Sequence, residues 1–230
     1  MGLLRAHWQM LVLAGIIFAL WQTPVVLPLK LIVVFFHELS HGLAALATGG
    51  EIESLTVTAD QGGLTVTRGG SVFAILSAGY LGSLLIGMGL FAAALRSAAD
   101  RLVLALLGVG LVVVAALYVR EGFALAFSLG AGGLMLAGAR WLPGLGADLI
   151  LRLIGLASMI YVPYAILSDT ILRAHLHSDA RMLAEEVGGA TVLWGGLWLV
   201  VSLGAIGLAL RYLAAQGSNP VPLPRAKAPH

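Results

Sequence analysis

The sequence predicts an all-α polytopic membrane protein with six to seven transmembrane helices and a small β-hairpin after the second one. Of its 230 residues, 60% are hydrophobic and only 10% are charged, and the mean hydropathy is +0.99. A soluble globule of this length could not bury that much apolar surface. Long runs of Leu, Ala, Val and Gly lack the alternation of barrel strands, so the spans should be helices, which satisfy their own backbone hydrogen bonds in lipid.

Apolar runs separated by charged residues, Pro or Gly define the candidate spans. The first run is short and stops at Pro24, and the fifth is thin and rich in Gly, so the count is six or seven. Lys and Arg fall equally on the two sides of an alternating chain, and they therefore do not predict the orientation. The candidates lie near residues 8–23, 28–48, 72–95, 101–119, 122–139, 147–173 and 190–213.

The composition also limits the chemistry and the partners. Residues 1–215 are expected to form one membrane-embedded domain with its core at about 28–200, and the Pro-rich, basic tail at 216–230 is expected to be disordered. The chain has no Cys, which excludes disulfides and leaves His, Asp and Glu for any metal site. A scattered net charge of +2 gives no reason to expect nucleic acid. The lipid bilayer is the partner that composition predicts.

Residues 51–68, EIESLTVTADQGGLTVTR, interrupt the helical pattern. Apolar and polar residues alternate on both sides of Asp60-Gln61-Gly62-Gly63, and many of them are β-branched. This pattern predicts a β-hairpin with a glycine-containing turn. The alternative is a surface loop that is rich in Thr.

The segment VVFFHELSHG at residues 33–42 places His37, Glu38 and His41 in an otherwise apolar run. Residues four apart on a helix lie on the same face, so both imidazoles can present a nitrogen to one ion. In the H-E-x-x-H pattern the two histidines bind a divalent cation, the glutamate is a general base and an open position holds water. The segment therefore predicts a zinc site with Glu38 as the catalytic base.

The apolar setting strengthens this interpretation. An ionisable side chain inside a span costs roughly 2.5–3.5 kcal/mol on insertion scales, and such residues usually mark a functional site. The alternative is that these three side chains only form hydrogen bonds with neighbouring helices, or lie at the membrane interface close to residues 48–50.

On these residues the chain resembles the site-2 protease family of intramembrane zinc metalloproteases, most closely its bacterial M50B-like branch. The resemblance implies that His37 and His41 bind Zn²⁺ and that Glu38 activates water. It also implies hydrolysis of a peptide bond in or near the membrane segment of a protein substrate, in the bacterial cytoplasmic membrane. The matching features, within about 28–200, are HELSHG at 37–42, the Gly-Gly hairpin, SAGYLGS at 77–83 and Ser178-Asp179-Ala180.

The family also supplies a third metal ligand, an Asp from a later segment that is commonly followed by Gly. This chain lacks that Asp-Gly pair, and the nearest match is Asp179, followed by Ala180 and Arg181. Asp169 is the reserve, because it lies inside an apolar run where an unpartnered carboxylate is expensive. Asp179 could instead lie in the first turn of a helix capped by Ser178, and Asp169 could pair with Arg173 one turn on.

Three further features have both a functional and a plain interpretation. Gly79, Ser83 and Gly87 form a small-xxx-small stripe, which favours close packing of the third span against the His37 helix or generic bundle packing. The hairpin could bind an unwound substrate strand by β-augmentation, or only cover the cavity or lie on the lipid headgroups. His175 and His177 could support the site, although such histidines are more often exposed to solvent.

A non-catalytic binding or regulatory membrane protein that keeps the metalloprotease fold is the alternative function. The intact Glu38 favours the enzyme, because a metal site without a hydrolytic task needs no general base there. The incomplete match at Asp179 favours the alternative. A transporter is disfavoured because the sequence has no internal repeat. The substrate, the cleavage point and the oligomeric state are not predicted.

Overall fold

The computed structural model describes residues 3–173, 177–214 and 218–219. Within them, six helices are long and apolar enough to cross a membrane, so the chain is a multi-pass integral membrane protein. α1 (Leu3–Ala19) corresponds to the first candidate span, and with 17 residues it is too short to be counted with the six. The other helices are η1 (Pro24–Val26), α2 (Leu27–Ala47), α3 (Val72–Arg96), α4 (Asp100–Tyr118), α5 (Gly122–Trp141), α6 (Gly144–Ile166), η2 (Leu167–Leu172), α7 (Asp179–Val187) and α8 (Thr191–Ala214).

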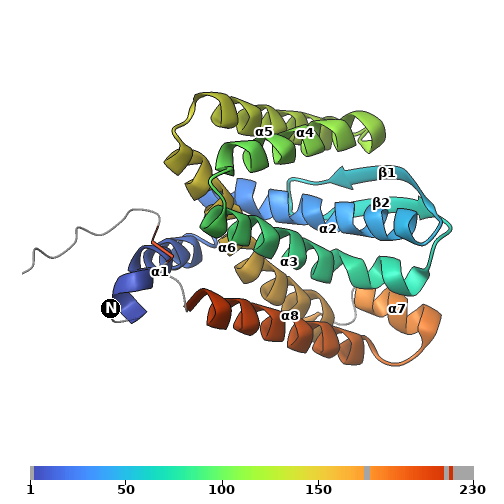
Figure 1. Ribbon diagram of the computed structural model, residues 1–230. Coiled ribbons are helices and arrows are strands. Elements are labelled where there is room, and N and C mark those ends of the chain that lie inside the picture. Colours follow the sequence, from blue (N-terminus) through green and yellow to red (C-terminus); the bar gives the residue numbers. More distant parts are fainter. Residues whose placement is uncertain (1–2, 174–176, 215–217, 220–230) are drawn as a thin grey trace, which may run out of the picture.

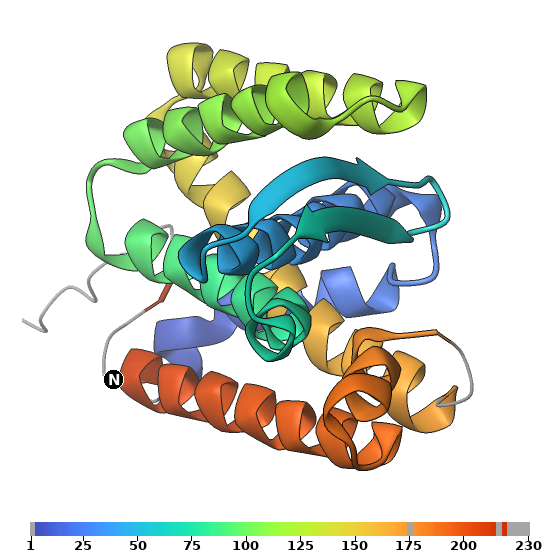
Figure 2. The same cartoon turned by 90° about the vertical axis from the view of Figure 1, so that its right-hand side faces the viewer.

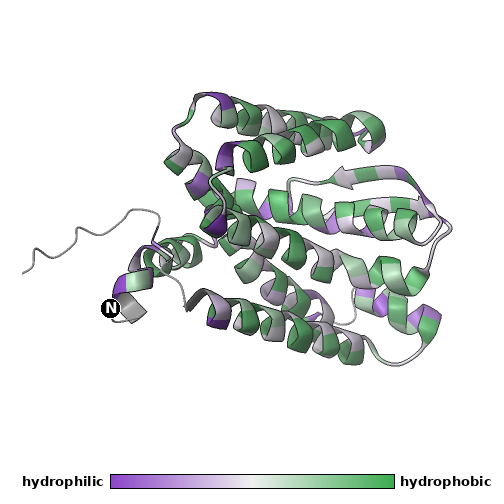
Figure 3. Ribbon diagram, viewed as in Figure 1, coloured by the Kyte–Doolittle hydropathy of each residue, from purple (hydrophilic) through white to green (hydrophobic). Residues whose placement is uncertain are grey.

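α2, α3 and α6 form the centre of the bundle, and α4, α5 and α8 lie around them (Figure 1). In the most apolar part of each span, 67% of α2 and 61% of α6 with η2 are buried, against 22% in α4 and 17% in α8. Hydrophilic residues gather at helix ends and on α7, whereas the long helices are mostly hydrophobic (Figure 3). The peripheral helices therefore present apolar side chains to lipid, and the central helices can hold polar groups.

Small residues bring the central helices together. The predicted packing of the third span against the His37 helix is confirmed, because α3 packs along α2. A Cβ atom at Gly87 would overlap the Ser158 side chain of α6, and one at Gly155 would lie 2.8 Å from the Gly87 carbonyl oxygen. The stripe that begins at Gly79 therefore lets α3 approach both of its neighbours.

The predicted β-hairpin is confirmed, with β1 (Glu51–Val57) paired antiparallel to β2 (Gly63–Arg68). Gln61 in the turn has a φ of 65°, a left-handed conformation. The hairpin runs back along α2, with the α4–α5 pair on its other side (Figure 2). Leu55 and Val57 of β1 are 1% exposed, and Thr56 donates a hydrogen bond to Glu121. β1 is thus packed into the molecule, whereas β2 stays partly exposed.

The end of α6 departs from regular helical geometry. Pro163 lies inside α6, and the chain continues as η2, a π-helix that contains Asp169. Such segments are rare and often occur at functional sites. A Cβ atom at Gly195 of α8 would overlap the Thr170 side chain, so α8 packs closely on η2. After the undescribed residues 174–176, Ser178 caps α7 by accepting a hydrogen bond from the Arg181 backbone.

Two residues of the predicted tail are described, and both bind α1. The backbone N–H of Ser218 donates to the Ala6 carbonyl oxygen, and the Asn219 side chain bonds the backbone of Arg5 and Gln9. The remainder of the tail, residues 216–217 and 220–230, lies outside the described residues, so its predicted disorder stays a prediction.

Candidate active site

The two motif histidines lie side by side on the face of α2 that meets α3. Their ring centroids are 4.7 Å apart in an edge-on arrangement. A Cβ atom at Gly79 of α3 would lie 2.6 Å from Nε2 of His37 and 2.6 Å from Cε1 of His41. Phe35 and Phe36, on other faces of α2, are at most 1% exposed. Glycine at position 79 therefore leaves room for both imidazoles against the α3 backbone.

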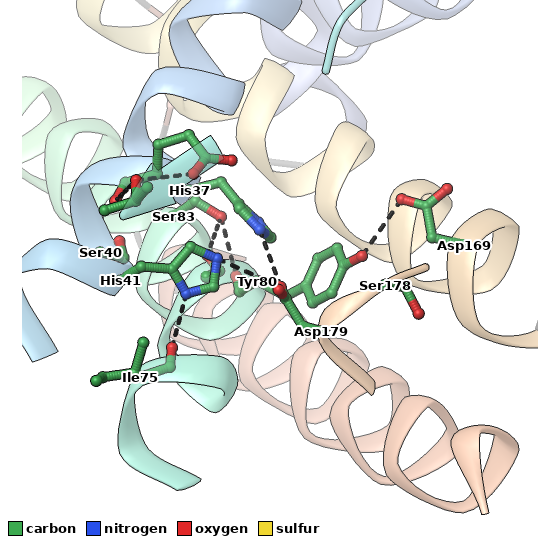
Figure 4. A network of polar contacts seen from close by, with 12 residues as sticks. His37, Ser40, His41, Ile75, Tyr80, Ser83, Asp169, Ser178 and Asp179 are labelled. Carbon is green, nitrogen blue, oxygen red and sulfur yellow. Dashed lines mark hydrogen bonds and ion pairs between the residues drawn. The ribbon is translucent and has the colours of Figure 1, made fainter. Parts of the chain in front are cut away.

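Asp179, in the first turn of α7, completes a three-residue cluster (Figure 4). Its Oδ2 lies 3.0 Å from Nε2 of His37 and 3.4 Å from Nε2 of His41. The ligand atoms of the three residues all lie within 4.8 Å of one another. Burial alone would raise the pKa of Asp179, but the imidazoles of His41 and His37, when they carry a proton, hold it below its usual range.

A backbone carbonyl orients one of the histidines. Nδ1 of His41 lies 2.7 Å from the carbonyl oxygen of Ile75, which can only accept a hydrogen bond. Nδ1 is therefore the protonated nitrogen, and Nε2 points its lone pair towards Asp179 when the imidazole is neutral. Within the described residues, Oδ2 of Asp179 is buried without a hydrogen-bond partner, and it faces the two imidazole nitrogens. A lone pair and a carboxylate oxygen that face one another in this way fit a shared cation.

Glu38 lies beside the cluster and is not one of its three members. It is 5% exposed, and its Oε2 lies 2.8 Å from the Thr65 hydroxyl of β2. The same hydroxyl lies 2.9 Å from the Glu38 carbonyl oxygen. A Cβ atom at Gly63 of β2 would lie 2.6 Å from Cγ of Glu38. β2 therefore holds the carboxylate in place.

Two cavities meet at these residues. One, of about 380 Å³, is lined on its far side by η2 and the hairpin turn, and the other, of about 580 Å³, extends between β2 and α7. Glu38, Gly63, His177, Ser178 and Asp179 line both. A chain that crossed from one cavity to the other would therefore pass Glu38 and the three-residue cluster.

Asp169 occupies a different place from Asp179. Its Oδ2 accepts a hydrogen bond of 3.3 Å from the Tyr80 hydroxyl, and its Oδ1 accepts one of 2.5 Å from Arg173. It lines the smaller cavity but is not in the metal-binding group. His177 is exposed at the rim of both cavities, and His175 lies outside the described residues. Of the two candidate acids, the structure brings Asp179 to the histidines.

Sequence reasoning missed two polar side chains at the site. Thr65 lay in the predicted hairpin, but nothing in its spacing indicated that it would contact Glu38. Tyr80 belongs to the segment SAGYLGS at 77–83, but the sequence assigned it no role. In the structure the centroid of its ring lies 4.6 Å from that of the His37 ring. A tyrosine inside a membrane span needs a hydrogen-bond partner for its hydroxyl. This need is the one feature of the sequence that indicated an acceptor, such as an acid, near Tyr80.

A comparison with protein-family models finds that the Peptidase M50B-like model matches residues 10–209. A search of the curated proteins and a search of the solved structures found no match.

Proposed function

The chain belongs to the Peptidase M50B-like family, and we propose that it is an intramembrane zinc metalloendopeptidase. In this proposal it hydrolyses a peptide bond within or near the membrane segment of a protein substrate. The observation that carries the proposal is the convergence of His37, His41 and Asp179 beside a buried Glu38, at the junction of two cavities.

The donor set supports Zn²⁺. Two imidazole nitrogens and one carboxylate oxygen, with an open position, are ligands typical of catalytic zinc. Among the described residues, the buried Oδ2 of Asp179 lacks a hydrogen bond, and Gly79 leaves room for the rings, so the three side chains fit a cation held between them. When bound, Zn²⁺ would lower the pKa of water and polarise the substrate carbonyl.

The chain's own residues would perform the proton transfers. Glu38 would take a proton from the attacking water at its carboxylate and deliver it to the leaving amine, as a general base and then a general acid. Thr65 would keep the Glu38 carboxylate turned towards the cavities through its hydrogen bond. The backbone at Gly63 allows the hairpin to lie this close to Glu38.

The depth of the site supports a membrane-embedded substrate. His41 lies six residues before Ala47, the last residue of α2, which corresponds to about 9 Å along the helix. The cluster is therefore inside the span but near one end of it. We expect the substrate to be cut in a membrane segment close to that face.

β2 offers a way to hold an unwound substrate. Residues of β2, and none of β1, line the larger cavity beside Glu38. An extended substrate could pair with this edge by β-augmentation, which would place its backbone across Glu38. Proline at position 64 or 66 should then reduce cleavage while zinc binding is kept. Unchanged cleavage by a folded proline variant would leave the hairpin only the role of holding Glu38.

The test of the proposed function compares the wild type with Glu38→Gln in zinc content and in cleavage of a set of transmembrane substrates. Both proteins should bind one zinc ion, and Glu38→Gln should cleave about 10²- to 10⁴-fold more slowly, the range that general-base catalysis contributes. Equal cleavage by both would overturn the role of Glu38. If both bind zinc and neither cleaves any substrate, the chain is instead a non-catalytic membrane protein that keeps the metalloprotease fold.

A further inference from the structure

The two histidines of the cluster are held in different ways. His41 is fixed by its hydrogen bond to the Ile75 carbonyl oxygen. Within the described part of the chain, Nδ1 of His37 has no hydrogen-bond partner. Its ring lies edge-on between two other rings, with centroid distances of 4.7 Å to His41 and 4.6 Å to Tyr80. Apart from the 3.0 Å approach of its Nε2 to Asp179, ring packing is what orients the His37 imidazole.

Tyr80 is anchored at both ends. Its ring is 5% exposed and packs against His37 on α2 and Trp198 on α8, with a centroid distance of 5.7 Å to the latter. Its hydroxyl donates to Oδ2 of Asp169 across the smaller cavity (Figure 4). Oδ1 of Asp169 in turn accepts from Arg173. The hydroxyl thus connects the packing around His37 to the π-helix at the end of α6.

We propose that Tyr80 is a positioning residue that sets the orientation of the His37 imidazole, and that Asp169, held by Arg173, anchors Tyr80. The proposal rests on the zinc site of the proposed function and assigns Asp169 a role without metal contact. Groups behind metal ligands commonly fix the orientation of the ligand, and replacing them typically lowers metal affinity or activity by 10- to 100-fold.

Two observations favour this role over a purely structural one. The Tyr80–Asp169 hydrogen bond, at 3.3 Å, is longer than the 2.5–3.0 Å usual for hydroxyl donors and therefore contributes little to stability, while among the described residues it is the one hydrogen bond of the Tyr80 hydroxyl. Asp169 also lies in a membrane-spanning segment, where an acid is costly and usually has a function. Its pair with Arg173 is partly exposed, with 34% and 53% of the two side chains accessible, and is worth little for stability.

Zinc affinity, measured by chelator competition on the full chain in detergent, tests the proposal without cleavage. Tyr80→Phe keeps the ring and removes the anchor, and Asp169→Leu removes the acceptor. Each should weaken zinc binding about tenfold. Asp169→Asn keeps an oxygen that accepts the Tyr80 hydrogen bond and should stay within twofold of the wild type. Tyr161→Phe is the matched control, because Tyr161 lines the same cavity but packs on Trp21.

A double variant sharpens the test. Tyr80→Phe and Asp169→Leu remove the two ends of one hydrogen bond. The double variant should therefore bind zinc as tightly as whichever single variant has the lower zinc affinity. Thermal unfolding of zinc-free Tyr80→Phe should match the wild type, which a structural role for the Tyr80 hydrogen bond would not allow.

Three outcomes would overturn the proposal. They are zinc affinity of Tyr80→Phe within twofold of the wild type, an equal loss in Tyr161→Phe, and a loss in Asp169→Asn as large as in Asp169→Leu. The last would mean that the charge of Asp169 matters directly. A wild type that binds zinc with the expected dependence on Tyr80 but cleaves nothing would contradict the proposed protease activity and leave this inference standing.

Discussion

Among the described residues, the bundle buries two clusters of ionisable groups, towards opposite ends of α6, besides the single buried Lys30. One is the cluster of His37, His41 and Asp179, and the other surrounds Arg152 in the first half of α6. Both place ionisable side chains inside a membrane protein, where they are expensive. They differ in how the polar atoms are used, and this difference separates a structural site from a chemical one.

Arg152 has all its guanidinium nitrogens occupied. Nε donates to Asp148 at 2.7 Å, Nη1 to the Ser218 carbonyl oxygen at 2.5 Å and Nη2 to the Ala94 carbonyl oxygen at 3.3 Å. Ser218 is in turn bonded to α1. Neither Arg152 nor Asp148 lines the two cavities beside Glu38. This cluster therefore holds α1, α3, α6 and the residues after α8 together.

The His37 cluster leaves its lone pairs directed at one point. Within the described residues, Oδ2 of Asp179 and Oδ2 of Asp148 both lack a hydrogen bond, but only that of Asp179 faces two imidazole nitrogens, in a cluster that opens on two cavities. A buried charge therefore does not mark a functional site by itself. Convergent lone pairs next to a cavity do, because they fit a cation and leave room for a substrate.

The largest expected effect comes from filling the space against the imidazoles. Gly79→Ala would place a methyl group 2.6 Å from the rings of both His37 and His41. We expect zinc affinity to fall by more than about 100-fold. This loss exceeds the 10- to 100-fold that is typical when a residue that only supports a metal ligand is replaced. Gly89→Ala is the control on the same helix, since nothing lies within 4 Å of a Cβ atom there. Unchanged affinity in Gly79→Ala would contradict the ring positions.

The Arg152 cluster should respond in stability and not in metal binding. Arg152→Met leaves Asp148 buried without its partner, which costs about 3 kcal/mol, or roughly 100-fold in the folding equilibrium. Denaturant unfolding in detergent measures the loss. The folded fraction should bind zinc as the wild type does. A drop in its zinc affinity would show that the two clusters are coupled through α6.

Thr65 tests the contact between the hairpin and Glu38. Thr65→Val removes a hydrogen bond to a carboxylate worth about 1.5 kcal/mol, so kcat should fall about tenfold with zinc affinity unchanged. Thr67→Val is the matched control, because Thr67 lines the same cavity and has no bond to Glu38. Equal effects of the two variants on kcat would argue for a general effect on the hairpin.

The smallest effect is expected at the exposed end of the hairpin. Arg68 pairs with Glu51 and Glu53, and its side chain is 74% accessible. Such surface pairs contribute about 0–1 kcal/mol. Arg68→Gln should therefore leave unfolding within about 0.5 kcal/mol of the wild type. A larger loss would place this end of the hairpin among the stabilising contacts.

Local patterns predicted most of the fold. Long apolar runs indicated six to seven spans, of which the structure has six within the described residues, and the alternation at 51–68 indicated the hairpin, since both patterns depend only on neighbouring residues. Whether the first apolar run, near residues 8–23, forms a membrane span could not be predicted. It is apolar enough for a span, but its helix ends at Ala19, several residues before Pro24.

The site could be predicted only where its residues are close in sequence. His37, Glu38 and His41 are recognisable because helical spacing places them together. The choice between Asp179 and Asp169 depends on the π-helix and on where α7 begins, which local spacing does not encode. The contacts of Thr65 with Glu38 and of Tyr80 with His37 are tertiary, so no pattern along the chain could predict them.

The most direct test of the zinc site is the zinc affinity of Asp179→Asn beside that of Asp169→Asn and the wild type. The wild type should bind one zinc ion, and Asp179→Asn should bind it more than about 100-fold more weakly, because an amide is a poor ligand for zinc. Asp169→Asn should stay within twofold of the wild type. Full zinc affinity in Asp179→Asn, with the loss in Asp169→Asn instead, would contradict the assignment of the third ligand.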